Sequence, residues 1–139
     1  MQWFFWSLLS ALFAAATAVL AKIGVAGVDS NLATAVRTTV ILIFTWLIAL
    51  YTAGGVSIEK LSARTWIFLT LSGLATGLSW LCYFRALQLG QASRVAPVDK
   101  LSVVFVIVFA ALFLGERLTI AKFAGGILIA VGAIVLALA

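Results

Sequence analysis

The sequence is poor in the residues that build catalytic and metal centres. It has no histidine, one cysteine and only four acidic residues among 139. A zinc site would therefore lack its usual nitrogen and sulfur ligands, and the lone Cys82 cannot form a disulfide within the chain. With the carboxylates also widely scattered, no catalytic set is visible. We expect neither an enzyme nor a protein that carries a metal or another cofactor.

Charge is scarce as well. Only 9% of the residues are charged and 65% are hydrophobic, whereas soluble domains carry roughly 25% charged residues. The net charge of +5 would suggest nucleic-acid binding in a soluble protein. Lysine and arginine at the ends of membrane helices, however, contact lipid headgroups and set the topology. We interpret the positive charge in this second way and expect no nucleic-acid partner.

What the sequence does contain is a series of long apolar runs, and its mean hydropathy is +1.28. A run of about 20 apolar residues crosses a ~30 Å hydrocarbon core as a helix. No segment shows the alternation that a membrane barrel strand needs. The sequence predicts an all-α integral membrane protein, a five-transmembrane-helix bundle in a single domain over residues 1–139. The expected helices cover residues 3–21, 31–52, 65–89, 95–114 and 119–138.

Short connections separate these runs, so successive helices should be antiparallel neighbours. Asp29 and Ser30 are natural caps for the second helix. The Gly54-Gly55 pair should end that helix region, and Pro97 is tolerated in the first turn of the fourth helix, where the N–H groups lack partners anyway. A very tight turn at residues 116–117 should lead into the fifth helix.

The basic residues are divided almost equally between the two membrane sides. An odd number of spans puts the termini on opposite sides, and orientation depends on an asymmetry of Lys and Arg. The near tie predicts insertion in both orientations and an antiparallel pair of chains; the alternative is that weaker features fix one orientation. One side carries Lys60, Arg64, Arg117 and Lys122, and the other Lys22, Arg85 and Arg94, with Arg37 and Lys100 a turn or two inside.

Among the charged residues within the expected spans, Arg37 and Asp99 indicate function most strongly. Arg37 is about six residues into the second helix and Asp99 about five residues into the fourth, so both should lie roughly 7–9 Å deep on the same side. With Arg85 and Lys100 they would form one electropositive mouth. Charges inside a membrane indicate function by default, so we predict that Arg37 and Asp99 interact, directly or through an anionic or zwitterionic substrate. For Lys22 and Arg85, extension to the headgroups is the better interpretation.

The third helix carries a polar face. Ser72, Thr76, Ser79 and Tyr83 are spaced 4, 3 and 4 residues apart, which places them on one side of a helix, and Trp80 borders that side. This pattern is typical of the wall of a substrate cavity. Alternatively, the hydroxyl groups bond back to carbonyls of their own helix.

Small residues occupy positions where membrane helices could approach closely. Such stripes allow dispersion contacts between backbones, either within one bundle or between subunits. They are Gly73 and Gly77 in the third helix, and Gly126, Ala130, Ala133 and Ala137 in the fifth.

A set of short motifs between residues 81 and 119 is shared with a known family. They are Ala86-Leu87, Gly90, Ala92-Ser93, Ala96-Pro97 and the run Leu114-Gly115-Glu116-Arg117-Leu118-Thr119. With the Lys-Ile-Gly end of the first helix and the glycine-rich fifth helix, this stretch resembles the EamA family of the drug/metabolite transporter superfamily. Most members look like two inverted five-helix halves, and this chain resembles one half, as in the half-size bacterial and archaeal branch.

The resemblance implies a carrier of small metabolites in a bacterial or archaeal inner membrane, often an exporter. It also implies an antiparallel dimer, either a homodimer or a heterodimer with a similar half, that works by alternating access. The first helix lacks the carboxylate of the related small multidrug resistance proteins, so antiport of cationic drugs against protons is not expected. Two alternatives stay open: an accessory half with no transport of its own, and a lipid-headgroup flippase that binds anionic lipid at Arg37 and Lys100.

Overall fold

The computed structural model describes residues 2–52 and 61–139. Within them the chain is helical, with no strand, and five stretches are long and apolar enough to span a membrane. This confirms the predicted all-α membrane fold; the Gly54-Gly55 break lies outside the described residues. The spans are α1 (Gln2–Gly24), α2 (Ser30–Thr52), α3 (Ala63–Leu89), the pair α4 (Ala92–Asp99) and α5 (Ser102–Phe113), and α6 (Ile120–Leu138).

Side-chain caps define where several helices begin. Asp29 Oδ1 accepts hydrogen bonds from the amides of Asn31 and Leu32 at 2.9 and 3.0 Å, so it caps α2 as predicted. Ser30 is instead the first residue of that helix. The Thr119 hydroxyl accepts from the amide of Lys122 at 3.3 Å and caps α6. These bonds satisfy amides that have no partner within the first turn of a helix.

The chain packs as two units, Met1–Lys22 with Leu89–Ala139, and Ile23–Gln88. The first contains α1, α4, α5 and α6, and the second contains α2 and α3. Each has its own internal contacts. The single transmembrane domain over residues 1–139 therefore stays a prediction.

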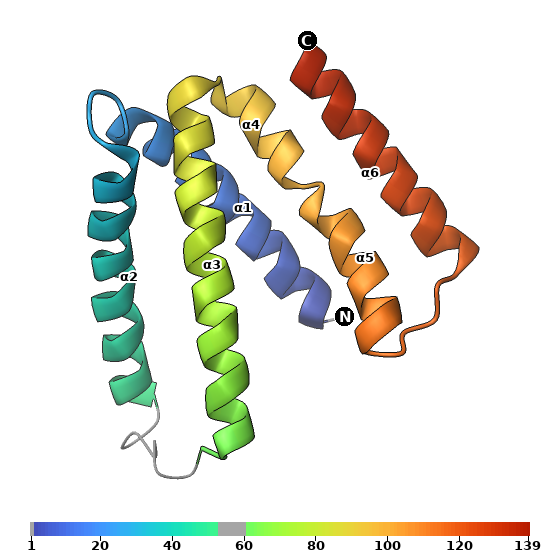
Figure 1. Cartoon of the computed structure of the whole chain (residues 1–139), viewed down its shortest axis with the longest axis horizontal. Helices are drawn as coiled ribbons and strands as arrows, with labels where there is room; N and C mark the ends of the chain where they lie inside the picture. The colour runs from blue at the N-terminus through green and yellow to red at the C-terminus, as the bar shows by residue number, and fades with distance from the viewer. Residues whose placement is uncertain (1, 53–60) are drawn as a thin grey trace. The chain divides into compact units, whose positions relative to one another are not determined.

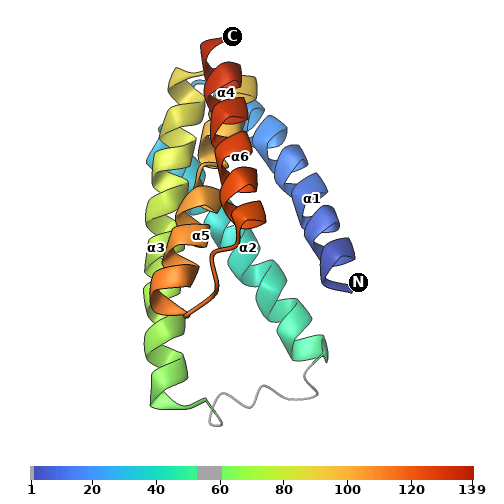
Figure 2. The ribbon, with the colours of Figure 1, turned by 90° about the vertical axis from the view of Figure 1, so that its right-hand side faces the viewer.

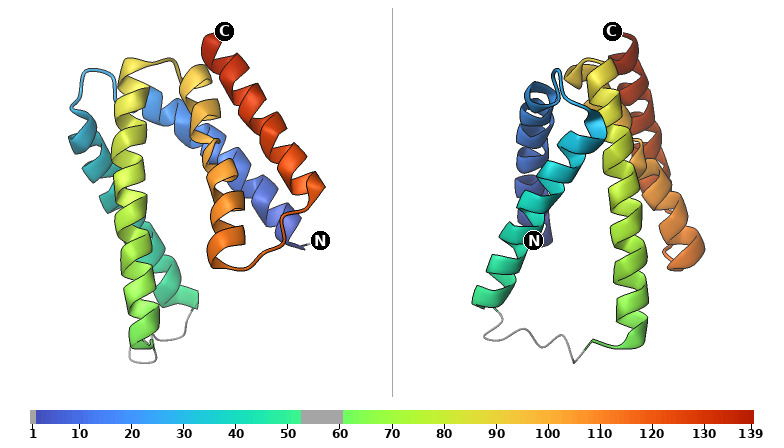
Figure 3. Two further views of the ribbon diagram at one scale, coloured as in Figure 1. Left: turned by 45° about the vertical axis from the view of Figure 1, so that its right-hand side comes forward. Right: turned by 60° about the vertical axis from the view of Figure 1, so that its left-hand side comes forward.

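In the second unit, α2 and α3 meet at one end and diverge towards the other (Figures 2 and 3). The meeting end is formed by the start of α2 and the last turns of α3. There the Gln88 side-chain amide donates a hydrogen bond to the carbonyl of Val28, and Phe84 and Leu87 are buried. The two helices are thus held together at one end.

In the first unit, α6 runs antiparallel to α4 and α5 and packs along them (Figure 1). Gly126 and Ala133 are buried in this contact region, and a Cβ at Gly126 would lie 3.5 Å from Ile107 Cδ1. This part of the small-residue stripe serves packing within the chain. Lys22, expected to extend to the headgroups, donates from Nζ to the carbonyl of Gly90 at 2.8 Å and ties the end of α1 to the start of α4.

The fourth span differs from the prediction in two ways. It begins at Ala92 rather than near Val95, and it is interrupted after Asp99. The amides of Lys100 and Leu101 bond to carbonyls three residues back, at 3.1 and 3.0 Å, instead of four. Pro97 lies inside α4 beyond its first turn, where a proline removes one helical hydrogen bond, and kinks in helices are common near prolines. The predicted single helix over residues 95–114 was wrong in this respect.

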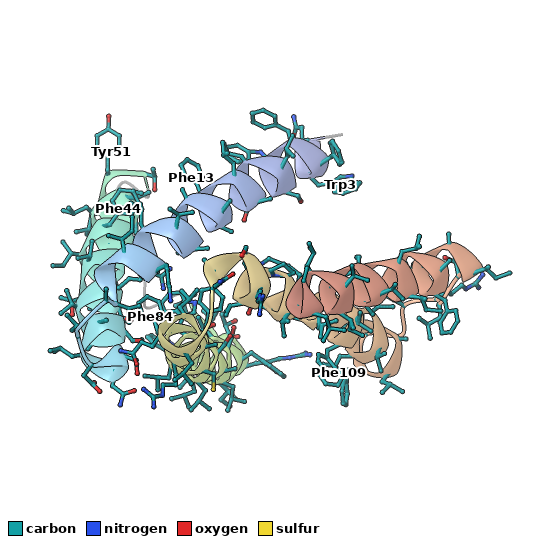
Figure 4. The ribbon with its side chains drawn as sticks, turned by 90° about the horizontal axis from the view of Figure 1, so that it is seen from above. Trp3, Phe13, Phe44, Tyr51, Phe84 and Phe109 are labelled. Atoms are coloured by element: carbon teal, nitrogen blue, oxygen red, sulfur yellow. The ribbon has the colours of Figure 1, made fainter. Side chains whose placement is uncertain are left out.

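Large apolar side chains cover the outside of every span. Phe13, Phe44 and Phe109 project from α1, α2 and α5 (Figure 4) and are 53–62% exposed. Trp3 lies at the start of α1, and Tyr51 projects from the last turn of α2, positions typical of aromatic residues at a membrane interface. A soluble protein does not expose such a continuous apolar surface. The chain is a multi-pass membrane protein.

Candidate functional site

The most unusual side-chain arrangement in the chain surrounds Arg37. Its guanidinium carbon lies 4.4 Å from the ring centroid of Trp80 and 5.4 Å from that of Phe84. Both distances are within the ~6 Å range of a cation–π contact, which strengthens when the partners are removed from water. The contact joins α2 to α3 and places Arg37, expected in the electropositive mouth, beside Trp80, expected at the border of the polar face.

The Arg37 guanidinium lies at about the same depth in the span as the Arg37 backbone. Arg37 lies seven residues after Ser30, the start of α2, which is about 10 Å along the helix. Its two aromatic partners lie nine and five residues before Leu89, the end of α3 at the same end of the unit. That is about 7–13 Å from that end. Extension of Arg37 to the headgroups is therefore not what the structure shows.

No carboxylate compensates this charge within the described part of the α2–α3 unit. Asp29 is its single described carboxylate, and Asp29 caps α2. Across the described residues, no hydrogen bond or ion pair of the Arg37 guanidinium is present; it lies against the two rings and interacts electrostatically with Tyr83. The two rings therefore hold the guanidinium, and none of its N–H donors has a hydrogen-bond acceptor among the described residues.

Asp99 and Lys100 belong to the other unit, at the end of α4. Lys100 Nζ lies 3.1 Å from Asp99 Oδ2, so the two neighbours form an ion pair, and both side chains retain some exposure. Asp99 is seven residues after Ala92, so it lies about 10 Å into its span, a little deeper than predicted. An interaction between Arg37 and Asp99 stays a prediction. Helix interruptions of this kind form the substrate and ion sites of many transporters.

The polar face of α3 divides into two parts. The Thr76 hydroxyl donates to the carbonyl of Ser72 at 2.9 Å, so this one hydroxyl bonds back to its own helix. Ser79 is exposed, and Tyr83 is half-buried one turn from Trp80. The cavity wall predicted for Thr76, Ser79, Trp80 and Tyr83 stays a prediction.

Sequence reasoning missed Phe84. It lies four residues after Trp80, so the two rings share one face of α3. The spacing is visible in the sequence, but the use of both rings depends on the matching depth of Arg37 on another helix. Phe84 is 3% exposed.

A second, smaller feature lies at the turn between α5 and α6. A cavity of about 150 Å³ is bordered there by Val106, Ile107, Ala110, Glu116, Arg117, Leu118 and Lys122. Lys122 Nζ lies 2.9 Å from Glu116 Oε2, and Gly115 adopts a φ of +66°, which favours glycine. The Gly-Glu-Arg motif therefore shapes this turn.

Comparison with known proteins decides the family. The model of the EamA-like transporter family matches residues 1–138. The chain belongs to this family. An "uncharacterized transporter in cobO 3'region" from Sinorhizobium sp. is 55% identical over 136 residues, which cover 98% of this chain and 96% of that protein. No solved structure matches the chain.

The EamA membership confirms the resemblance drawn from the motifs at residues 81–119 and identifies a membrane transporter. Because the match covers nearly all of both proteins, the Sinorhizobium relative and this chain are of nearly equal length. The EamA family and the relative's name point to transport and not to enzymatic catalysis.

Proposed function

We propose that this EamA protein is a metabolite exporter that works as an antiparallel dimer by alternating access. The observation that supports the proposal is the set of five spans in the described residues, the number expected for one half of the ten-helix members that the family resemblance implies. Alternating access in inverted-repeat transporters uses two such halves around a central site. The nearly equal division of Lys and Arg between the membrane sides supports a partner of opposite orientation.

The substrate route in this proposal is lined by Arg37, Thr76, Ser79, Trp80, Tyr83, Asp99 and Lys100. The contact of Arg37 with Trp80 supports the part on α2 and α3. The interruption after Asp99 supports the part on α4, because freed backbone groups and charges at a broken helix can bind a substrate inside a membrane.

Topology reporters test the dimer. Fusions after Ala139 should report both membrane sides in comparable amounts, and two lysines added after Ala139 should bias the ratio. A fusion that reports one side alone would rule out the antiparallel homodimer and require a second, oppositely oriented half. Such a result would favour the accessory-subunit alternative.

Cysteine labelling tests the route along α3. In a Cys82→Ser background, single cysteines at Thr76, Ser79 and Tyr83 should react with a membrane-impermeant thiol reagent. Cysteines at Leu74 and Leu78, on the other side of the helix and 62% and 65% exposed in the isolated chain, should be protected by lipid. Equal labelling of both sides would contradict a water-filled route on this face.

A further inference from the structure

We propose that Arg37 binds the oxyanion group of a singly charged organic anion, with Trp80 and Phe84 holding the guanidinium in position. The inference rests on the proposed transport function and names the substrate class of that site. It is drawn entirely from residues of the α2–α3 unit.

An arginine side chain can contact aromatic rings and donate hydrogen bonds at the same time. Its planar face interacts with aromatic rings, while its N–H donors lie in the plane and point outward from the edge. The ring centroids of Trp80 and Phe84 lie 4.4 and 5.4 Å from the guanidinium carbon of Arg37. Side chain and rings come from different helices, so the guanidinium is fixed without any of its donors being used by the described residues.

The single positive charge of Arg37 limits the charge of the anion that can bind. Asp29 caps α2. Arg85 keeps its charge but is exposed and donates to Gln88 Oε1 at 3.0 Å, so Arg37 is the one half-buried cation among the described residues of this unit. One available guanidinium matches one negative charge shared by two oxygens, as in a carboxylate or a phosphodiester, which accept its paired donors. A dianion such as inorganic phosphate would need a second cation.

The aromatic rings determine the polarity of the ligand part that lies next to its charged group. The half-buried Trp80 lies beside the donors, with the buried Phe84 behind it, and many neighbouring exposed side chains of the two helices are hydrophobic. An anion with an apolar body fits this environment better than a small hydrated anion, because burial of its apolar part makes binding more favourable. The ligand is therefore an amphipathic carboxylate or an anionic lipid headgroup.

Equilibrium binding of radiolabelled benzoate tests the site in the full-length protein, reconstituted in phosphatidylcholine nanodiscs. Benzamide, its neutral isostere, should compete at least tenfold less well than unlabelled benzoate. Arg37→Gln should weaken benzoate binding about tenfold or more. Arg37→Lys keeps the charge but loses the planar donors, so its affinity for benzoate should lie between those of the native protein and Arg37→Gln. Its intermediate affinity decides the matter if Arg37→Gln does not fold.

The matched control is Arg64→Gln. Arg64 lies in the first turn of α3, with its guanidinium 5.8 Å from the ring of Phe68, and this variant should bind benzoate as the native protein does. Phosphatidylglycerol in the nanodiscs separates the two sources of the anion: displacement of benzoate assigns a lipid phosphodiester, and no displacement assigns a soluble carboxylate.

Equal affinity for benzoate and benzamide, or unchanged benzoate binding in both Arg37 variants, would overturn the proposal. Binding that depends on Arg37 without any flux in proteoliposomes would contradict the transport function and not this site. Flux of neutral or cationic compounds without benzoate binding would contradict this site and not the transport function.

Discussion

The two helix hairpins of the chain are held together by different interactions. The α6 helix packs against α4 and α5 through small residues, with Gly126 and Ala133 buried along the contact. The α2–α3 hairpin instead meets at one end, through a hydrogen bond and the contact of Arg37 with two aromatic rings, and diverges at the other (Figure 3).

The difference matters because apolar helices gain little from association in lipid. Close packing of small residues gains dispersion over a long contact, which suits a fixed element. A hairpin held at one end has few contacts to lose if its two helices shift relative to each other. The glycine face of α3 belongs to this less packed region: a Cβ at Gly73 or Gly77 would meet nothing within 4 Å. Gly73, Gly77, Trp80 and Phe84 are spaced 4, 3 and 4, so this glycine face continues from the Arg37 site.

The largest effect on the free energy of unfolding should come from leucine at a packed glycine, compared with leucine at a glycine that faces open space. At Gly126 a Cβ alone would already touch Ile107, so Gly126→Leu overpacks the contact and should lower the free energy of unfolding by about 2–3 kcal/mol. Gly77→Leu brings the same gain in helix propensity but meets open space, so it should change stability by less than about 1 kcal/mol. Unfolding in a titration of SDS against mild detergent measures both.

The difference between these two variants isolates packing from propensity. Equal losses in Gly77→Leu and Gly126→Leu would mean that α2 closes on α3 in the membrane, and the contrast between the hairpins would disappear. Gly126→Ala is the mild control, since a Cβ contact of 3.5 Å is ordinary van der Waals distance.

A medium effect is expected where the two units are predicted to cooperate. Asp99→Asn and Arg37→Gln should each reduce folded yield or transport, and the double variant should partly recover yield. Removing one charge leaves the other uncompensated in the membrane. We expect a coupling of about 1–2 kcal/mol, within the range for interacting residues.

The local ion pair provides the control for this cycle. Lys100 already lies 3.1 Å from Asp99, so a cycle of Lys100→Gln with Asp99→Asn measures how much of the loss is local. Losses that simply add in the Arg37–Asp99 cycle would show that the two residues do not interact, and the two units would then contribute independently to the substrate site.

Much of this architecture was predictable from local sequence, since apolar length sets a span and Asp29 has the chemistry of a cap. The interruption after Asp99 was not, because Pro97 is harmless in a first turn and the polar run before Val95 hides a helix that begins at Ala92. The Arg37 site was half predictable. Charge and depth identify the arginine, but Phe84 enters through packing between helices, which local spacing does not encode.

The smallest effect concerns the exposed turn of the well-packed hairpin. Lys122 and Glu116 pair at 2.9 Å, with 44% and 54% of their side chains exposed. Exposed pairs contribute about 0–1 kcal/mol because solvent screens them and both side chains lose freedom. Glu116→Gln should therefore lower the free energy of unfolding by at most about 0.5 kcal/mol and respond to salt, while Gly126→Leu should not. SDS titrations at low and high ionic strength measure this. A loss as large as that of Gly126→Leu would show that the Gly-Glu-Arg turn, and not the small-residue contact, is what holds α6 against α4 and α5.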